Sequence, residues 1–387
     1  MIYLDNAATT KIDSRVLVAM KPFLKDEYGN AGTLYSLGIS ARKAVENARK
    51  QVAWFINARP EQIVFTSGGT ESNNMVFHDA MFRGFTSGNK KIIISSIEHD
   101  SIMNSAEFLQ NKCGFFHSKI RHFDDGKVDL EDLFSKIDED TTLVSIQMMN
   151  NEIGSINDVD KIAKICNERR VPFHCDSVQA AGCLEIDVKK MGCDFLSVSG
   201  HKIHGPKGTG FLYVKNPQKF TPMIHGGGGQ EHGLRGGTEN VAGIVGLGKA
   251  CELETGLSYD DRFYTTKMKL AFWYALEEQM GKNGTSDILH ENASSAVGYG
   301  KTLNIRFDGV DAETLVLVLS SKNVCISAGS ACRSHESNPS RVLTAIGLTK
   351  EQARNSIRIS FSRMNTFDEC EKAGRIVADT ATELYKM

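Results

Sequence analysis

Short apolar runs rich in β-branched residues alternate with amphipathic helical patterns over the first two thirds of the chain. The helical patterns include Ile39–Phe55 and Asp158–Glu168, whose apolar residues recur with helical spacing. The runs expected to be strands are Gln62–Thr66, Lys91–Ser95, Thr142–Met148, Val171–Cys175, Phe195–Val198 and Gly210–Val214. This alternation predicts an α/β unit with a largely parallel sheet, because helical crossovers usually connect parallel strands.

The pattern changes after residue 256, where helices are grouped together. The expected elements there are helices at Asp260–Met280, Ala312–Ser320, Arg341–Ile346 and Thr366–Tyr385, and strands at Thr302–Phe307 and Ser356–Ser360. A chain of 387 residues is long enough for two domains. We predict a large α/β domain over residues 15–256 and a smaller α+β domain formed by residues 1–14 and 257–387.

Charge and cysteine content narrow the class of protein. The formal net charge is −2 without a basic block, so neither nucleic acid nor a membrane is an expected direct partner. The N-terminal MIYLDNAATT lacks the regions of a secretory signal, and no apolar run approaches the ~20 residues of a membrane span. Nine cysteines without a CxxC pair favour reduced thiols over a metal site. We therefore expect a cytoplasmic protein without a structural metal.

A lysine lies in a glycine-flanked loop directly after an expected strand. The segment reads Ser199-Gly200-His201-Lys202. A lysine held still and partly desolvated can form a Schiff base, and Ser199 and His201 offer donors to a phosphate. The alternative is a polar surface turn. Lys207 is the competing lysine, but its Pro-Lys-Gly setting suits an outer turn.

Thr66-Ser67-Gly68-Gly69-Thr70 joins an expected strand to a helical pattern. Glycines at such a turn let backbone N–H groups and the threonine hydroxyl face an anion at the helix N-terminus. The segment is neither a Walker A loop nor a GxGxxG motif. An ordinary helix cap is the alternative interpretation.

Polar residues follow two more strands. Asp176 ends one of them and can pair with a pyridinium nitrogen, and Gln179 can donate to a ring oxygen. The alternative for Asp176 is the N-cap of a following helix. His99 follows the strand Lys91–Ser95 and can stack on a flat cofactor or move a proton; a structural histidine is its alternative.

In this order the segments resemble the cysteine desulfurases, the NifS/IscS-like group of the class V aminotransferase family, which are fold-type I pyridoxal-phosphate enzymes. The resemblance extends from Tyr3 to Ser360, nearly the whole chain. Its further motifs are Asn150-Asn151-Glu152-Ile153-Gly154, Gly226–Thr238 and Ser327-Ala328-Gly329-Ser330-Ala331-Cys332. It implies pyridoxal 5′-phosphate as cofactor, a large domain with a mostly parallel sheet and a smaller α+β domain.

The resemblance also implies roles for individual residues. Lys202 would carry the cofactor, Asp176 and Gln179 would hold its ring nitrogen and oxygen, and His99 would stack on the ring. The residues that would hold the phosphate are Gly69, Thr70, Ser199 and His201. Thr238 would reach the phosphate of the neighbouring subunit in a homodimer. Asn151 and Arg358 would bind the substrate carboxylate, which suits a guanidinium fork.

The persulfide-carrying cysteine of the family corresponds to Cys332, in a polar loop. Arg333 and His335 beside it favour the nucleophilic thiolate. A loop cysteine without function is the alternative, and Cys325 is expected to be buried in a strand. The implied activity converts L-cysteine to L-alanine and a Cys332 persulfide. Its sulfur would pass to an acceptor protein in iron–sulfur assembly, tRNA thiolation or DNA phosphorothioation.

Other activities compete with this interpretation. A related aminotransferase or β-lyase would share Lys202 and Asp176, a selenocysteine lyase would also need Cys332, and a regulatory protein would keep the cofactor without turnover. The chain departs from the family in Asn30-Ala31-Gly32-Thr33 and in His232, where arginine is frequent. The first departure and the loop after Cys332 resemble the desulfurases of DNA phosphorothioation systems.

Overall fold

The computed structural model describes residues 1–227, 229–257, 259–293, 299–329 and 339–387. Seven strands form one mixed sheet in the order β2-β8-β7-β6-β5-β3-β4. Their bounds are β2 Ile63–Thr66, β3 Lys91–Ser95, β4 Phe116–Ile120, β5 Thr141–Gln147, β6 Phe173–Asp176, β7 Phe195–Ser199 and β8 Gly210–Val214. β8 runs antiparallel to both of its neighbours, and the other pairings are parallel. The predicted largely parallel sheet is confirmed.

One strand of this sheet was not predicted. β4 has the sequence Phe-His-Ser-Lys-Ile and is mostly exposed or half-buried, because it lies at the edge of the sheet. An edge strand has one free side and needs no apolar run. The buried strands β3 and β8 have the predicted bounds.

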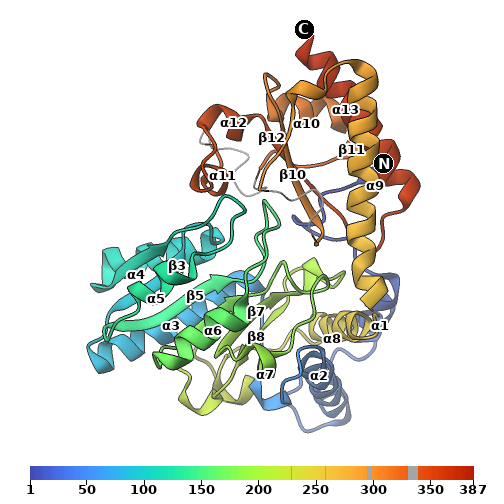
Figure 1. The fold of residues 1–387 in the computed structure, drawn as a ribbon. Coiled ribbons are helices and arrows are strands. Elements are labelled where there is room, and N and C mark those ends of the chain that lie inside the picture. The colour runs from blue at the N-terminus through green and yellow to red at the C-terminus, as the bar shows by residue number, and fades with distance from the viewer. Residues whose placement is uncertain (228, 258, 294–298, 330–338) are drawn as a thin grey trace.

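The sheet lies between two layers of helices (Figure 1). The helices are α1 Ser14–Lys25, α2 Ser36–Phe55, α3 Gly69–Ser87, α4 Asp100–Cys113, α5 Leu130–Lys136, α6 Val159–Glu168, α7 Val188–Met191 and α8 Val241–Thr255. α3 and α4 share an apolar core with one face of the sheet, and the other helices with the opposite face. Adjacent strand residues serve opposite cores: Val64 lies in the first, while Ile63 and Phe65 lie in the second.

The C-terminal part of the chain forms a second unit. It contains α9 Tyr259–Asn283, α10 Ala312–Ser321, α11 Arg341–Ala345, α12 Lys350–Arg354 and α13 Phe367–Tyr385. Its strands are β1 Ile2–Tyr3, β9 Leu289–Glu291, β10 Thr302–Phe307, β11 Val324–Cys325 and β12 Ser356–Ser360. The order β12-β10-β9 is antiparallel, and β1 pairs with β11.

A separate apolar core holds this second unit together. Ile2 and Leu4 pack into it beside residues of α9, β10 and α13. The N-terminus and the C-terminal segment therefore share one core, distinct from the cores of the large sheet. We retain the division into 15–256 and 1–14 with 257–387 as a proposal that these cores support.

The cysteines in the described part of the chain form no disulfide. Most are buried, and Cys113 and Cys325 are half-buried. The expectation that Cys325 is buried was wrong. Cys325 ends the two-residue strand β11, which pairs only with β1 among the described residues, so no further described strand covers its other side.

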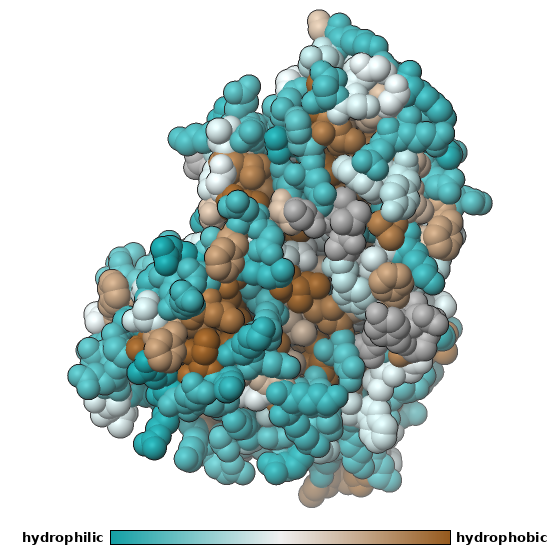
Figure 2. Space-filling view, in the orientation of Figure 1, coloured by the Kyte–Doolittle hydropathy of each residue, from teal (hydrophilic) through white to brown (hydrophobic). Residues whose placement is uncertain are grey.

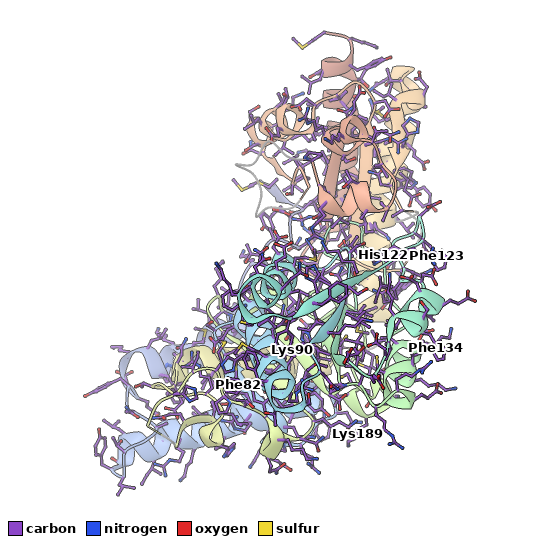
Figure 3. The ribbon with its side chains drawn as sticks, turned by 90° about the vertical axis from the view of Figure 1, so that its left-hand side faces the viewer. Phe82, Lys90, His122, Phe123, Phe134 and Lys189 are labelled. Atoms are coloured by element: carbon purple, nitrogen blue, oxygen red, sulfur yellow. The ribbon has the colours of Figure 1, made fainter. Side chains whose placement is uncertain are left out.

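Within the described residues, no helix has both the length and the apolar content to cross a bilayer. The face in Figure 2 is mainly hydrophilic, with separate hydrophobic patches. Phe82, Phe123 and Phe134 are exposed and lie apart from one another in Figure 3. Singly exposed aromatic residues of this kind are ordinary in globular proteins.

Candidate active site

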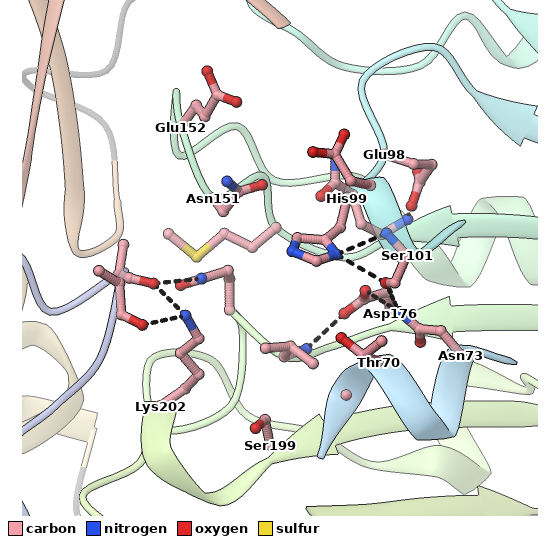
Figure 4. Close-up of a pocket in the computed structure, with 18 of the residues that line it drawn as sticks. Thr70, Asn73, Glu98, His99, Ser101, Asn151, Glu152, Asp176, Ser199 and Lys202 are labelled. Atoms are coloured by element: carbon pink, nitrogen blue, oxygen red, sulfur yellow. Dashed lines mark hydrogen bonds between the residues drawn. The ribbon is translucent and has the colours of Figure 1, made fainter. Parts of the chain in front are cut away.

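A pocket of about 280 Å³ opens where the parallel strands of the large sheet end (Figure 4). Loops at the carboxyl ends of parallel strands form the usual ligand crevice of such sheets. The predicted site residues that line this pocket are Gly69, Thr70, His99, Asn151, Asp176, Gln179, Ser199, His201, Lys202 and Arg358. Residues far apart in the sequence therefore come together at one edge of the sheet.

Cys332 lies outside the described residues, as do Arg333 and His335. Thr238 is exposed and is not among the described residues that line the pocket. The segment before Thr238 is fixed to the start of α3, because Arg235 Nε donates to Glu71 Oε1 at 2.9 Å.

Lys202 comes from the loop directly after β7. Gly200–Lys202 forms one turn of 3₁₀ helix, which turns the lysine into the pocket. Its Nζ donates to the carbonyl oxygens of Ala7 and, at 2.8 Å, Ala8. The alternative of a surface turn was wrong for this lysine, which is half-buried, whereas Lys207 is exposed.

The Asp176 carboxylate is held in a fixed orientation at the end of β6. Asn73 Nδ2 donates to Oδ2 at 2.9 Å, and the backbone N–H of Val178 donates to Oδ1 at 3.0 Å. A turn rather than a regular helix follows Asp176, so the alternative of a helix N-cap was wrong. Asn73 Nδ2 also lies 2.9 Å from Ser101 Oγ, which links the carboxylate to the start of α4.

His99 is the N-cap of α4. Its Nδ1 accepts from the backbone N–H of Ser101 at 3.1 Å and lies 2.8 Å from Ser101 Oγ. Because Nδ1 is an acceptor, the proton of the neutral ring is assigned to Nε2. Figure 4 shows the His99 ring, the Lys202 amine and the Asp176 carboxylate turned toward the same space.

The start of α3 provides the expected anion-binding end of the pocket. Gly68 has φ +147, a conformation that favours glycine, and α3 begins at Gly69. A Cβ on Gly69 would lie 2.6 Å from Val178 Cγ2, so a larger residue there would disturb the turn beside Asp176. His201 faces the same region, and its Nδ1 lies 3.1 Å from Thr9 Oγ1. Burial and the nearby Lys202 lower the pKa of His201 to about 4, so its ring is neutral at pH 7.

Arg358 lies in β12 and reaches the pocket from the C-terminal unit. Only 2% of this residue is exposed. Its Nη2 donates to Asp5 Oδ1 at 2.7 Å, and its Nη1 donates to the Asn151 carbonyl oxygen at 3.2 Å. The buried Nε has no hydrogen-bond partner within the described part of the chain. Asp5 therefore already binds one arm of the Arg358 guanidinium, the group predicted to bind the substrate carboxylate.

Comparison with known proteins decides which family this pocket belongs to. The sequence profile described as "Aminotransferase class-V" matches residues 2–372. Cysteine desulfurase IscS of Methanosarcina thermophila is 38% identical over 386 residues, which covers 100% of this chain and 93% of that protein. The chain belongs to the cysteine desulfurases of the class V aminotransferase family.

Solved structures agree with this assignment. A NifS-like protein superposes with a TM-score of 0.87 and 33% identity, covering 98% of both chains. DndA from Streptomyces lividans superposes with a TM-score of 0.74 and 30% identity, covering 93% of this chain and 99% of DndA. The predicted fold class, the pyridoxal-phosphate-dependent desulfurase activity and the cofactor of this desulfurase are confirmed.

The groups in the pocket fit pyridoxal 5′-phosphate. The start of α3 with Ser199 and His201 suits a phosphate, and the Asp176 carboxylate suits a protonated ring nitrogen. Gln179 Nε2 donates to the Ala7 carbonyl oxygen at 3.0 Å. Its Oε1 and the Oδ1 of Asn73 are buried without a partner in the described part of the chain. Buried polar atoms normally have partners, so these two mark positions where a polar ligand completes the site.

The residues that line the pocket of this desulfurase without having been predicted as site residues include Asn73, Glu98 and Arg341. Asn73 is four residues after Gly69 and shares its face of α3, which could have identified it. Glu98 precedes His99 and is 1% exposed, with Oε1 accepting from the Gln147 N–H at 2.9 Å. Burial raises the pKa of Glu98 to about 8, so this carboxyl is protonated at pH 7. No local sequence pattern identifies Arg341 as a pocket residue, because it belongs to the C-terminal unit and reaches the pocket only in the folded structure.

Proposed function

We propose that this desulfurase takes sulfur from free L-cysteine, releases alanine and carries the sulfur as a persulfide on Cys332. The observation that supports this function best is the convergence of Lys202, Asp176 and Arg358 on one pocket. When bound, the cofactor supplies an electron sink for the charge left by loss of a Cα proton. An amine, a carboxylate and a guanidinium are the protein groups that amino-acid chemistry with this cofactor requires.

Lys202 and Asp176 would handle the protons. The Lys202 amine, held beside Ala7 and Ala8, would take a proton from the substrate Cα and return one. The Asp176 carboxylate would keep the ring nitrogen protonated, and Asn73 and Val178 prevent it from turning away. His99 would lie against the ring face, and Gln179 would contact the ring oxygen.

Arg358 and Asn151 would bind the substrate carboxylate. The free cysteine must compete with Asp5 for the guanidinium, since Asp5 lies 2.7 Å from Nη2. The Nε of Arg358, which has no hydrogen-bond partner among the described residues, offers a second donor in the same plane. This arrangement favours a substrate with a carboxylate over a simple thiol.

Cys332 would perform the sulfur step as a thiolate. Its attack on the substrate sulfur forms an S–S bond while the C–S bond breaks, and the electron pair of that bond returns to the carbon side. Protonation of that carbon gives alanine, and the sulfur stays on Cys332 as a persulfide. A thiol reductant then releases it as sulfide.

The test of this function is the product ratio. Purified, cofactor-loaded protein is incubated with L-cysteine and excess dithiothreitol, and alanine and sulfide are measured over several turnovers. We expect equal amounts of the two products, because each turnover breaks one C–S bond. Formation of pyruvate and ammonia in place of alanine would identify a β-lyase, and the absence of any product would contradict the proposal.

We propose a homodimer in which Thr238 reaches the cofactor phosphate of the neighbouring subunit. Its exposure and its absence from the pocket of its own chain support this placement. Multi-angle light scattering is expected to give about twice the mass of one chain. The mass of a single chain at micromolar concentration, with the cofactor bound, would contradict it.

We propose a protein as the sulfur acceptor. The likeness to DndA supports the predicted DNA phosphorothioation subfamily, and the IscS relative keeps iron–sulfur assembly and tRNA thiolation as competing pathways. A cytoplasmic location and the lack of direct nucleic-acid binding stay predictions.

A further inference from the structure

Arg341 connects the two units of the molecule at the loop that carries His99, on one side of the pocket. It is the first residue of α11, in the C-terminal unit. Its Nη1 donates to the Ser96 carbonyl oxygen, and its Nη2 donates to the Glu98 carbonyl oxygen at 2.6 Å. Nη2 also lies 3.3 Å from Asp100 Oδ1. Two of these acceptors lie in the loop between β3 and α4, and the third is on the first residue of α4, so they flank His99 on both sides.

The large unit holds only part of this loop. The carbonyl oxygen of Ile97 accepts from Gln147 Nε2 at 2.7 Å and from Asn150 Nδ2 at 3.0 Å. The carbonyls on either side of it, those of Ser96 and Glu98, accept from Arg341. Three successive carbonyls therefore have side-chain donors, and the C-terminal unit supplies the donor for two of them.

Two further side-chain contacts hold the loop between β3 and α4 in place. Ile97 packs into a small apolar cluster with Ile153 and with residues of α11 and α12. On the other side, the His122 ring lies 3.0 Å from Ser95 Oγ and 2.9 Å from Ser96 Oγ. The start of the loop is thus fixed by His122 and by the apolar cluster. Its end beside His99 is held by the Arg341–Glu98 contact, by the Glu98 carboxyl against the Gln147 N–H and by the cap of α4.

A cation suits this position for a physical reason. Two carbonyls and a carboxylate oxygen present partial and full negative charge, and the planar guanidinium can donate to all three. A neutral or shorter side chain would leave part-buried carbonyls without donors, which costs free energy. Arg341 is 27% exposed at its side chain, so solvent replaces these contacts only in part.

We propose that Arg341 is a positioning residue for the desulfurase reaction: it fixes the backbone on both sides of His99 and so sets the place of the His99 ring against the cofactor. The C-terminal unit thereby helps to shape the side of the pocket against which the cofactor ring would lie. This inference rests on the proposed role of His99, and Arg341 acts through that residue.

The experiment compares Arg341→Met and Arg341→Lys with the wild type. Arg341→Met keeps the length of the side chain and removes every donor, whereas Arg341→Lys keeps the charge and one donor group. Arg375→Met is the matched control, because Arg375 is a half-exposed arginine of the same unit that pairs with Glu371 of its own helix. Hydrogen–deuterium exchange of residues 96–103 is measured on the cofactor-free proteins. Absorbance and circular dichroism of the bound cofactor, kcat and KM for L-cysteine are measured on the loaded ones.

In Arg341→Met we expect exchange of residues 99–102 to be about tenfold faster, because the loop loses its donors. We also expect a changed dichroism band of the cofactor and about tenfold lower kcat, with little change in KM, because Arg341 acts on the ring contact rather than on substrate binding. Arg341→Lys is expected to restore part of each effect, and Arg375→Met to match the wild type.

Wild-type exchange and an unchanged cofactor spectrum in Arg341→Met would overturn the inference. If Arg341→Met does not fold, Arg341→Lys decides: it must fold and show intermediate exchange, and wild-type values in it would overturn the inference. A failure of the proposed function is distinguishable, because it would appear as missing alanine in the wild type. The exchange measurement on cofactor-free protein does not depend on turnover.

Discussion

Lys202→Ala is expected to abolish alanine production and to remove the yellow absorbance of the bound cofactor. The Lys202 amine enters the pocket from the end of β7 and is held by the carbonyls of Ala7 and Ala8. Alanine at this position has no amine to bond the cofactor or to move the Cα proton. Loss of a covalent and proton-transferring group of this kind lowers turnover by at least about 10³-fold. Absorbance spectra and alanine assays on the same preparation measure both effects.

The matched control is Lys207→Ala. Lys207 lies five residues further along the same loop and is exposed, so its removal should leave spectrum and turnover near those of the wild type. Lys202→Arg adds a second comparison, because it keeps the positive charge but cannot bond the cofactor in the same way. Substantial alanine production by Lys202→Ala, or its loss in Lys207→Ala, would overturn the assignment of the lysine.

The sequence predicted those parts of the site that depend on local order along the chain. Each parallel strand delivers its following loop to the same edge of the sheet, so Asp176, His99 and Lys202 could be placed there once the strands were identified. Glycines at a strand–helix junction likewise identified the start of α3. These inferences needed only the direction of the strands and the chemistry of the side chains.

The parts that the sequence did not predict depend on packing between segments distant in the chain. The Asp5–Arg358 pair joins residues at opposite ends of the sequence, and Arg341 reaches Ser96 across the junction of the two units. Nothing in the local pattern of either partner indicates such a contact. The protonation of Glu98 is a similar case, because burial of its carboxyl, which lies against Gln147 of β5, raises its pKa to about 8.

Several strand and helix details also depended on tertiary context. β4 lacks an apolar run because it lies at the sheet edge, and the partly exposed Cys325 lies in a strand of two residues. Propensity and periodicity describe the average burial of an element. They cannot show which side of a strand stays without a neighbour.

Cys332→Ala is expected to keep the cofactor and lose sulfur transfer. The groups proposed to hold the cofactor line the described pocket and come from other segments, so the absorbance of the bound cofactor should match the wild type. Without the thiolate no group accepts the substrate sulfur, and we expect alanine and sulfide to fall together by about 100-fold or more. Labelled sulfur from L-cysteine should then reach neither the protein nor an added acceptor. Absorbance, product assays and mass spectrometry of the alkylated protein measure these three effects.

Cys325→Ala is the matched control for this variant. Among the described cysteines of the C-terminal unit, Cys325 is half-buried and Cys370 is buried, and Cys325 precedes Cys332 by seven residues. Because it lies in β11 with its backbone paired to β1, we expect its removal to leave the persulfide and both products near wild-type levels. Full sulfide release by Cys332→Ala, with loss in Cys325→Ala, would move the acceptor role to Cys325. Full release by both variants would show that sulfur leaves the cofactor without a protein thiol, and the desulfurase would then act as a lyase toward solution thiols.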